Sequence, residues 1–284
     1  MRTPRKLLAE QKNKGYDEYW NFLFRRLLFE MLSENDLDLF QDMDLELDES
    51  FSEAFLRNVE RLLLDEPLGH VLGYEWFYGL KLTVNQDVLI PRGETEELVA
   101  HVSADIDDYF NGEEIVIADI ACGSGAIAIA SKLDHPNAKV YASDVSEKAI
   151  AVAKKNAIDN KADIAFFVGD MATPLIENNI KVDVCICNPP YIKNEEDIED
   201  SVKNFEPHVA LFGGKDGLDL YRKLLDQLPS LLNPKAMVAF EIGFDQKDAI
   251  FHEIQQRFPE AFILSKQDIH QKDRMVFVYF NITP

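Results

Sequence analysis

From about residue 113 onward the chain alternates between short apolar runs and helical patterns, and this alternation restricts the possible folds more than any other feature. Strands that alternate with helices form a parallel sheet with helices packed on both faces. We therefore expect an α/β domain with seven strands. The strands are predicted at residues 115–120, 140–143, 164–168, 182–187, 236–242, 262–265 and 275–281.

Helices are expected between most of these strands. Ser146 precedes an Ala-rich helical pattern and is the predicted N-cap of its helix. The last two strands have no helix between them, which predicts an antiparallel hairpin at the edge of the sheet. The predicted helices span residues 126–133, 146–160, 218–232 and 246–258.

The N-terminal part of the chain has a different pattern. Apolar residues recur at helical spacing over residues 5–32, and residues 34–49 carry eight acidic and no basic side chains with apolar residues interleaved. Ser50 or Ser52 is expected to cap a further helix. We predict a helical domain over residues 1–73, a β-hairpin linker over 74–91 with a second extended run at 82–90, and the α/β domain over 92–284.

The overall composition excludes several kinds of protein. A net charge of -22 repels phosphate backbones, so nucleic acid is a poor candidate partner. The three cysteines are too few for a disulfide framework and lack zinc-ligand spacing, and we expect buried thiols in a reducing cytoplasm. No signal peptide and no apolar run long enough to span a membrane is visible, and no metal site is expected.

Three motifs follow consecutive predicted strands, at the edge where open α/β sheets bind ligands. The small residues of the turn after residue 120 allow close backbone approach to a ligand, at a helix N-terminus that favours anionic groups. Asp144 ends the second strand and can accept hydrogen bonds from ribose hydroxyls. Asp170 is expected to accept from an adenine amino group, with Met171 packed on the ring. These residues predict an adenosine-containing ligand held by Ala121, Cys122, Gly123, Ser124, Gly125, Asp144, Asp170 and Met171.

The motif Asn188-Pro189-Pro190-Tyr191 follows the fourth strand of the sheet. Its two prolines lack N–H groups and make the loop rigid. The Asn188 side-chain carbonyl and the Pro189 main-chain carbonyl can therefore converge on a planar –NH2 group, and Tyr191 is expected to cover its face. Such a loop aims a nitrogen lone pair at an electrophilic methyl group, mainly by positioning.

The chain resembles the release factor glutamine methyltransferases beyond this loop. The similarity is strong over about residues 67–284, whereas the N-terminal helices agree only in size and helical character. The matching segments are residues 67–73, 77–79, 88–96, 205–211, 213–218, 241–243 with Gln246, and 273–274.

This resemblance implies a class I S-adenosyl-L-methionine methyltransferase, with a Rossmann-like seven-stranded sheet and a small all-α domain that grips the release factor. The enzyme would methylate the N5 amide nitrogen of the glutamine in a Gly-Gly-Gln motif and release S-adenosyl-L-homocysteine. Asn188, Pro189 and Tyr191 would be catalytic, the whole loop including Pro190 would bind the glutamine amide, and Asn188 would also contact the cofactor. The chain departs from the usual family residues at Gly93, Ala121 and Met171.

Two other functions are weighed against this one. An adenine or cytosine amino-methyltransferase of DNA or RNA uses a similar loop, because a nucleobase amine is also a planar –NH2 group, but it must also hold phosphates and flip its base. The chain has 29 Lys+Arg against 51 Asp+Glu, so binding to heparin or single-stranded DNA discriminates between the two. A non-catalytic scaffold is the other alternative, and it has no use for two convergent acceptors.

Overall fold

The computed structural model describes residues 2–110 and 113–283 of the chain. It divides into two compact units, of which the first is Met1–Tyr74 with Glu199–Phe205 and the second is Glu75–Ile198 with Glu206–Pro284. Each unit buries its own apolar core.

The first unit is a bundle of helices, and the helical character predicted for the N-terminal part is confirmed. Its core contains Leu7, Phe24 and Phe55, which come from three different helices and are almost completely buried. Burial of such side chains supplies the main stabilisation of short helices. The helices are α1 (Pro4–Lys12), α2 (Glu18–Ser33), α3 (Glu49–Leu62), α4 (Leu68–Leu72) and α9 (Asp200–Phe205).

Two local details of this unit differ from the predicted pattern. The first helical segment is split into α1 and α2 near Gly15, whose φ of +82° lies in the left-handed region that glycine favours. The predicted cap at Ser50 or Ser52 is wrong. Asp48 caps α3 instead, because its carboxylate accepts the N–H of Phe51 at 2.7 Å.

The second unit contains the predicted seven-stranded sheet, in the order β5-β4-β3-β6-β7-β9-β8. Strands β3 to β7 run parallel, and β9 is antiparallel to both of its neighbours, β7 and β8. The antiparallel hairpin is therefore confirmed, with β8 at the edge. The strands are β3 (Val116–Ile120), β4 (Lys139–Asp144), β5 (Ile164–Val168), β6 (Val182–Cys187), β7 (Leu232–Glu241), β8 (Phe262–Gln267) and β9 (Asp273–Phe280).

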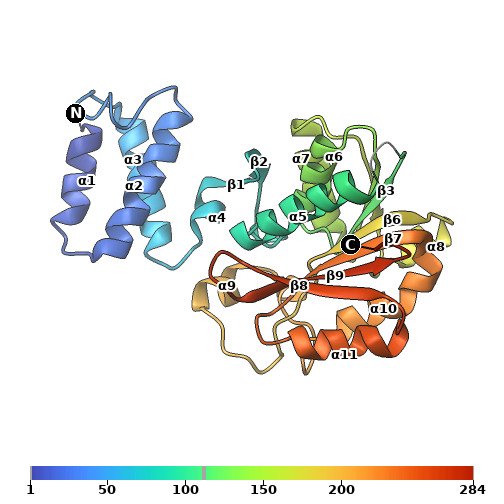
Figure 1. The fold of residues 1–284 in the computed structure, drawn as a ribbon. Helices are drawn as coiled ribbons and strands as arrows, with labels where there is room; N and C mark the ends of the chain where they lie inside the picture. The colour runs from blue at the N-terminus through green and yellow to red at the C-terminus, as the bar shows by residue number, and fades with distance from the viewer. Residues whose placement is uncertain (1, 111–112, 284) are drawn as a thin grey trace. The chain divides into compact units, whose positions relative to one another are not determined.

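Helices cover both faces of this sheet (Figure 1). One face packs against α5, α6 and α7, and the other packs against α8, α10 and α11. Cys185 and Cys187 face the second of these cores and are fully buried, as their spacing on one strand predicts. The helices are α5 (Gly93–Tyr109), α6 (Ala126–Asp134), α7 (Glu147–Asp159), α8 (Thr173–Glu177), α10 (Asp219–Leu231) and α11 (Lys247–Arg257), with a 3₁₀ turn η1 (His208–Ala210).

The predicted β-hairpin is present, but it is shorter than expected. Strands β1 (Tyr74–Phe77) and β2 (Leu80–Thr83) form a two-stranded sheet, and residues 84–92 are not a strand. The apolar residues Val84, Val88 and Ile90 instead bury their side chains in a small cluster with residues of α7. Their burial explains the apolar pattern that resembled a longer strand.

The strand order determines where a ligand can bind. The chain moves outward from β3 to β5 and then returns to place β6 on the other side of β3. The loops after β3, β4 and β6 consequently diverge above the sheet and leave a crevice at the carboxyl ends of these strands. All the polar motifs identified in the sequence follow one of these strands or β5.

Candidate active site

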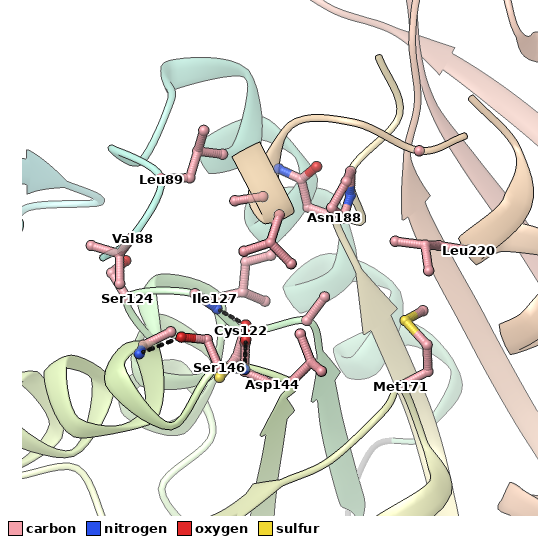
Figure 2. Close-up of a pocket in the computed structure, with 18 of the residues that line it drawn as sticks. Val88, Leu89, Cys122, Ser124, Ile127, Asp144, Ser146, Met171, Asn188 and Leu220 are labelled. Carbon is pink, nitrogen blue, oxygen red and sulfur yellow. Dashed lines mark hydrogen bonds between the residues drawn. The ribbon is translucent and has the colours of Figure 1, made fainter. Parts of the chain in front are cut away.

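A cavity of about 410 Å³ opens at the carboxyl ends of β3 to β6, within the range typical of small-molecule sites. Most of the predicted site residues line it, and Figure 2 shows Asp144, Met171 and Asn188 around the same space. Gly125, Pro189 and Tyr191 do not line it. The predicted residues that do are Ala121, Cys122, Gly123, Ser124, Asp144, Asp170, Met171, Asn188 and Pro190.

The turn after β3 has an unusual backbone. Ala121, Gly123 and Gly125 have φ values of +62°, +52° and +81°. A Cβ atom on Gly125 would lie 3.0 Å from the Cβ of Ala153, so this glycine permits close packing of α6 against α7. A Cβ on Gly123 would meet nothing within 4 Å, so the turn leaves open space above its backbone. The small residues therefore serve two purposes, helix packing and room for a ligand.

Asp144 connects this turn to the start of α7. Its Oδ2 accepts the N–H of Gly123 at 2.9 Å, and its Oδ1 accepts the N–H of Ser146 at 2.8 Å (Figure 2). Burial raises the pKa of the Asp144 carboxyl, although both backbone hydrogen bonds lower it. Ser146 caps α7 by accepting the N–H of Ala149 at 3.2 Å, which confirms the predicted N-cap. Each carboxylate oxygen retains a lone pair for a hydroxyl of a ligand.

Asp119, at the end of β3, is a buried carboxyl that the sequence motifs did not single out as a binding residue. It is fully buried, and its Oδ2 accepts the N–H of Ala128 at 3.0 Å. Its Oδ1 has no hydrogen-bond partner among the residues that the structure describes. Burial, together with the nearby Asp144, raises the pKa of Asp119 to about 7. A buried oxygen without a partner is costly, and a ligand with a positive charge or an N–H group would satisfy it.

The loop after β5 contributes both of its predicted residues, Asp170 and Met171, to the cavity lining. The carboxylate of Asp170 forms an ion pair with Lys223 of α10 and is half exposed, so it retains lone pairs for a ligand. Met171 lines the cavity with a φ of +53° and only 5% of its surface exposed. The hydroxyl of Ser143 donates to the main-chain carbonyl of Met171 at 2.7 Å and holds it in place. Lys223 also lines the cavity, and no local pattern marked it as a site residue.

The Asn188–Tyr191 loop leaves β6 and forms one wall of the cavity. Asn188 is half-buried, and its Nδ2 donates to the hydroxyl of Thr95 on α5 at 3.2 Å. Pro189 and Pro190 are buried, and Pro190 lines the cavity. The Tyr191 hydroxyl donates toward the carboxylate of Glu241 at 3.4 Å. Burial raises the pKa of Tyr191, and its side chain is not part of the lining of this cavity. The predicted cover of a substrate amide by Tyr191 stays a prediction.

A glycine-rich segment holds this loop from behind. A Cβ on Gly213 would lie 2.3 Å from the main-chain oxygen of Pro190, and one on Gly217 would lie 2.2 Å from that of Tyr191. Gln246 is buried and donates to the same Tyr191 oxygen at 2.9 Å, while its own Oε1 accepts the N–H of Gly243 at 2.9 Å. The backbone of the loop therefore has little freedom to move.

The two segments that flank the loop in the family resemblance meet through Glu206. Its buried carboxylate forms an ion pair with Arg92 and accepts the N–H of Ile90 at 3.1 Å. Arg92 lies directly before α5, and both Arg92 and Thr95 line the cavity. This contact joins residues more than a hundred positions apart and places the first turn of α5 beside the cavity.

The composition of the cavity suits a nucleoside with a charged amino acid arm. The Asp144 carboxylate suits ribose hydroxyls, while Asp119 and the N-terminus of α6 lie beside the open turn. In the described residues no group of three or more His, Cys, Asp or Glu side chains is arranged to hold a metal ion. No described helix is both long and apolar enough to cross a membrane.

Comparison with known proteins gives consistent matches. The model of the methyltransferase small domain matches residues 95–208. A release factor glutamine methyltransferase of Bacillus cereus is 41% identical over 253 residues, which cover 88% of this chain and 89% of that protein. One from Bacillus anthracis is 42% identical, with 85% and 84% covered. A solved methyltransferase from Pyrococcus furiosus shares the fold, with a TM-score of 0.50, 17% identity, and 80% and 99% covered.

Proposed function

Because the chain belongs to the release factor glutamine methyltransferases, we propose that its cavity holds S-adenosyl-L-methionine beside the glutamine amide of a release factor. The protein is an S-adenosyl-L-methionine-dependent methyltransferase. The observation that carries the proposal is the position of Asn188, which lies on a proline-stiffened loop at the wall of the cavity that Asp144 also lines.

The chain's own residues account for cofactor binding. Asp144 accepts hydrogen bonds from the ribose hydroxyls, and Met171 packs against the adenine. The open turn at Gly123 admits the methionine arm, whose amino group Asp119 can receive, while the N-terminus of α6 faces its carboxylate. The bound cofactor supplies an electrophilic methyl group on a sulfonium.

The loop residues position the nucleophile. Oδ1 of Asn188 and the main-chain carbonyl of Pro189 accept the two N–H groups of the glutamine amide. This arrangement holds the amide plane and raises the electron density on nitrogen, so that its lone pair points at the methyl group. With the cofactor bound, the nitrogen would form the new C–N bond as the S–C bond breaks, and it would then lose one proton to water. Catalysis depends on positioning and electrostatic stabilisation rather than on a strong base.

We further propose that residues 1–73 form the recognition domain for the release factor, that 74–91 link the domains, and that 92–284 carry out the transfer. The first unit has its own apolar core, as an independent recognition module requires. The target is the Gly-Gly-Gln loop of class 1 factors, which act in translation termination in the cytoplasm.

The test is transfer of labelled methyl groups to purified release factor, single-stranded DNA and ribosomal RNA, offered in parallel. We expect label in the release factor alone. Asn188→Ala should abolish this transfer while the affinity for the cofactor changes by less than about threefold, because the lost acceptor contacts the substrate. Near-normal turnover by Asn188→Ala would remove the loop from the mechanism. Labelling of nucleic acid would favour the nucleobase methyltransferase.

A further inference from the structure

Glu241 is a buried carboxylate that lies outside the cavity. It ends β7 and is 2% exposed, and no ion-pair partner lies within 4 Å of its carboxylate in residues 2–110 and 113–283. The charge of Arg274 lowers the pKa of Glu241 without an ion pair between the two side chains, so the hydrogen bonds that the buried carboxylate accepts are informative. Oε2 accepts the Thr95 hydroxyl at 2.6 Å, and Oε1 accepts the Tyr191 hydroxyl at 3.4 Å.

The Thr95 hydroxyl lies between Glu241 and Asn188. It has a single hydrogen, and above pH 7, where the Glu241 carboxyl is ionised, the short bond to Glu241 commits that hydrogen to the carboxylate. Only its lone pairs remain for Asn188, so the side-chain group that faces Thr95 at 3.2 Å must be the donor Nδ2. The Asn188 amide therefore has one preferred orientation, with Oδ1 at the opposite end.

We infer that Glu241 and Thr95 are positioning residues that select the Asn188 amide orientation in which Oδ1 is presented to the substrate. This inference rests on the proposed function. An Asn side chain has nearly the same shape after its amide is rotated by half a turn. Without the Thr95 hydroxyl, the rotated form would present Nδ2 and oppose the N–H groups of the glutamine amide. Gly217 and Gln246 fix the loop backbone but not the rotation of the Asn188 amide about its side-chain bond, so these contacts do not prevent the rotated form.

The test uses Thr95→Val, which keeps the shape and removes the hydroxyl, and Thr95→Ser, which keeps the hydroxyl. We expect Thr95→Val to lower kcat for release factor methylation roughly 10- to 100-fold, because a donor faces a donor in the rotated amide. Cofactor Kd should stay within about threefold, and Thr95→Ser should recover most of the lost rate. Thr83→Val is the matched control, since it removes a hydroxyl that accepts a hydrogen bond from Lys155 on an exposed part of the same unit.

A second readout separates positioning from a structural effect. The affinity for release factor, measured with S-adenosyl-L-homocysteine bound, should fall in Thr95→Val but show no further fall when Thr95→Val is added to Asn188→Ala. Glu241→Gln replaces the charged acceptor of the Thr95 hydroxyl with a neutral one, which weakens this hydrogen bond and should lower kcat about 3- to 10-fold. This variant tests the same role if Thr95→Val fails to fold.

The outcomes are distinguishable. A wild-type enzyme that does not label release factor refutes the proposed function. Wild-type labelling together with a Thr95→Val rate within twofold of it overturns the positioning role. Equal losses in Thr95→Ser and Thr95→Val, or additive losses with Asn188→Ala, also overturn it.

Discussion

Replacing Asp144 tests the cofactor site most quantitatively. Its carboxylate accepts two backbone N–H groups, from Gly123 and Ser146, and lines the cavity with its remaining lone pairs. Asp144→Asn keeps the volume but turns one acceptor into a donor, which then faces either a backbone N–H or a ribose hydroxyl. Asp144→Ala removes both acceptors.

The expected magnitude follows from these contacts. A hydrogen bond to a charged group contributes about 1.5–3 kcal/mol, so the loss of one such acceptor should weaken cofactor binding roughly 10- to 150-fold. Folding stability should change less than affinity does. Burial raises the pKa of Asp144, so removing the ionised group recovers part of the free energy lost with the backbone hydrogen bonds.

Titration calorimetry with S-adenosyl-L-methionine and S-adenosyl-L-homocysteine measures the effect, and urea unfolding verifies that the variants are folded. Asp159→Ala is the matched control, because it removes an exposed carboxylate from the other end of α7. A folded Asp144→Ala variant that binds the cofactor within twofold of wild type would refute the assignment of Asp144 to the ribose.

Three further changes have predictable effects on stability. Burial raises the pKa of Glu241 from 4.5 to about 7, so the stability that comes from its bound proton is fully present below pH 4.5 and is lost as the pH rises through 7. Between pH 5 and 8 the unfolding free energy of the wild type should fall by up to about 3 kcal/mol more than that of Glu241→Gln. Equal pH dependence of the two unfolding free energies would contradict this. Gly217→Ala should lower the unfolding free energy by about 2–4 kcal/mol, because φ is +77° and the added Cβ would lie 2.2 Å from the main-chain oxygen of Tyr191. Gly79→Ala should lower it by only about 1 kcal/mol, because φ is similar at +75° but the space around the Cβ is open. Ala121→Gly should raise the unfolding free energy by about 0.5–1 kcal/mol, because φ is +62°; a lower melting temperature would count against strain at this turn.

Local sequence patterns predicted much of the sheet. Strand β6 is buried on both faces and is a continuous apolar run, and the edge strand β5 is also a continuous apolar run, so the pattern predicts both strands at their observed ends. Ser146 was recognised as a cap because the cap lies within three residues of its partner. Helix α5 was not predicted, because its acidic first turn and interrupted apolar spacing lack a strong period.

The details that a local pattern could not predict involve residues distant in the sequence. The Lys223 ion pair with Asp170 spans 53 positions, and the Thr95 contact with Glu241 spans 146. The orientation of Asn188 depends on this second contact, because Thr95 also accepts from the Asn188 amide, and only the folded domain brings these residues together. A loop motif therefore identifies the chemistry, whereas the partners that orient each side chain depend on strand order.

The most direct test of the central claim is to locate the transferred methyl group by tandem mass spectrometry. Wild-type enzyme, S-adenosyl-L-methionine and purified release factor are incubated and the products digested, with a Gln→Ala release factor in parallel. The structure and the family predict one methyl group on the side-chain amide of the Gly-Gly-Gln glutamine, and none on the Gln→Ala factor. A methyl group on another residue, or equal methylation of both factors, would contradict the account.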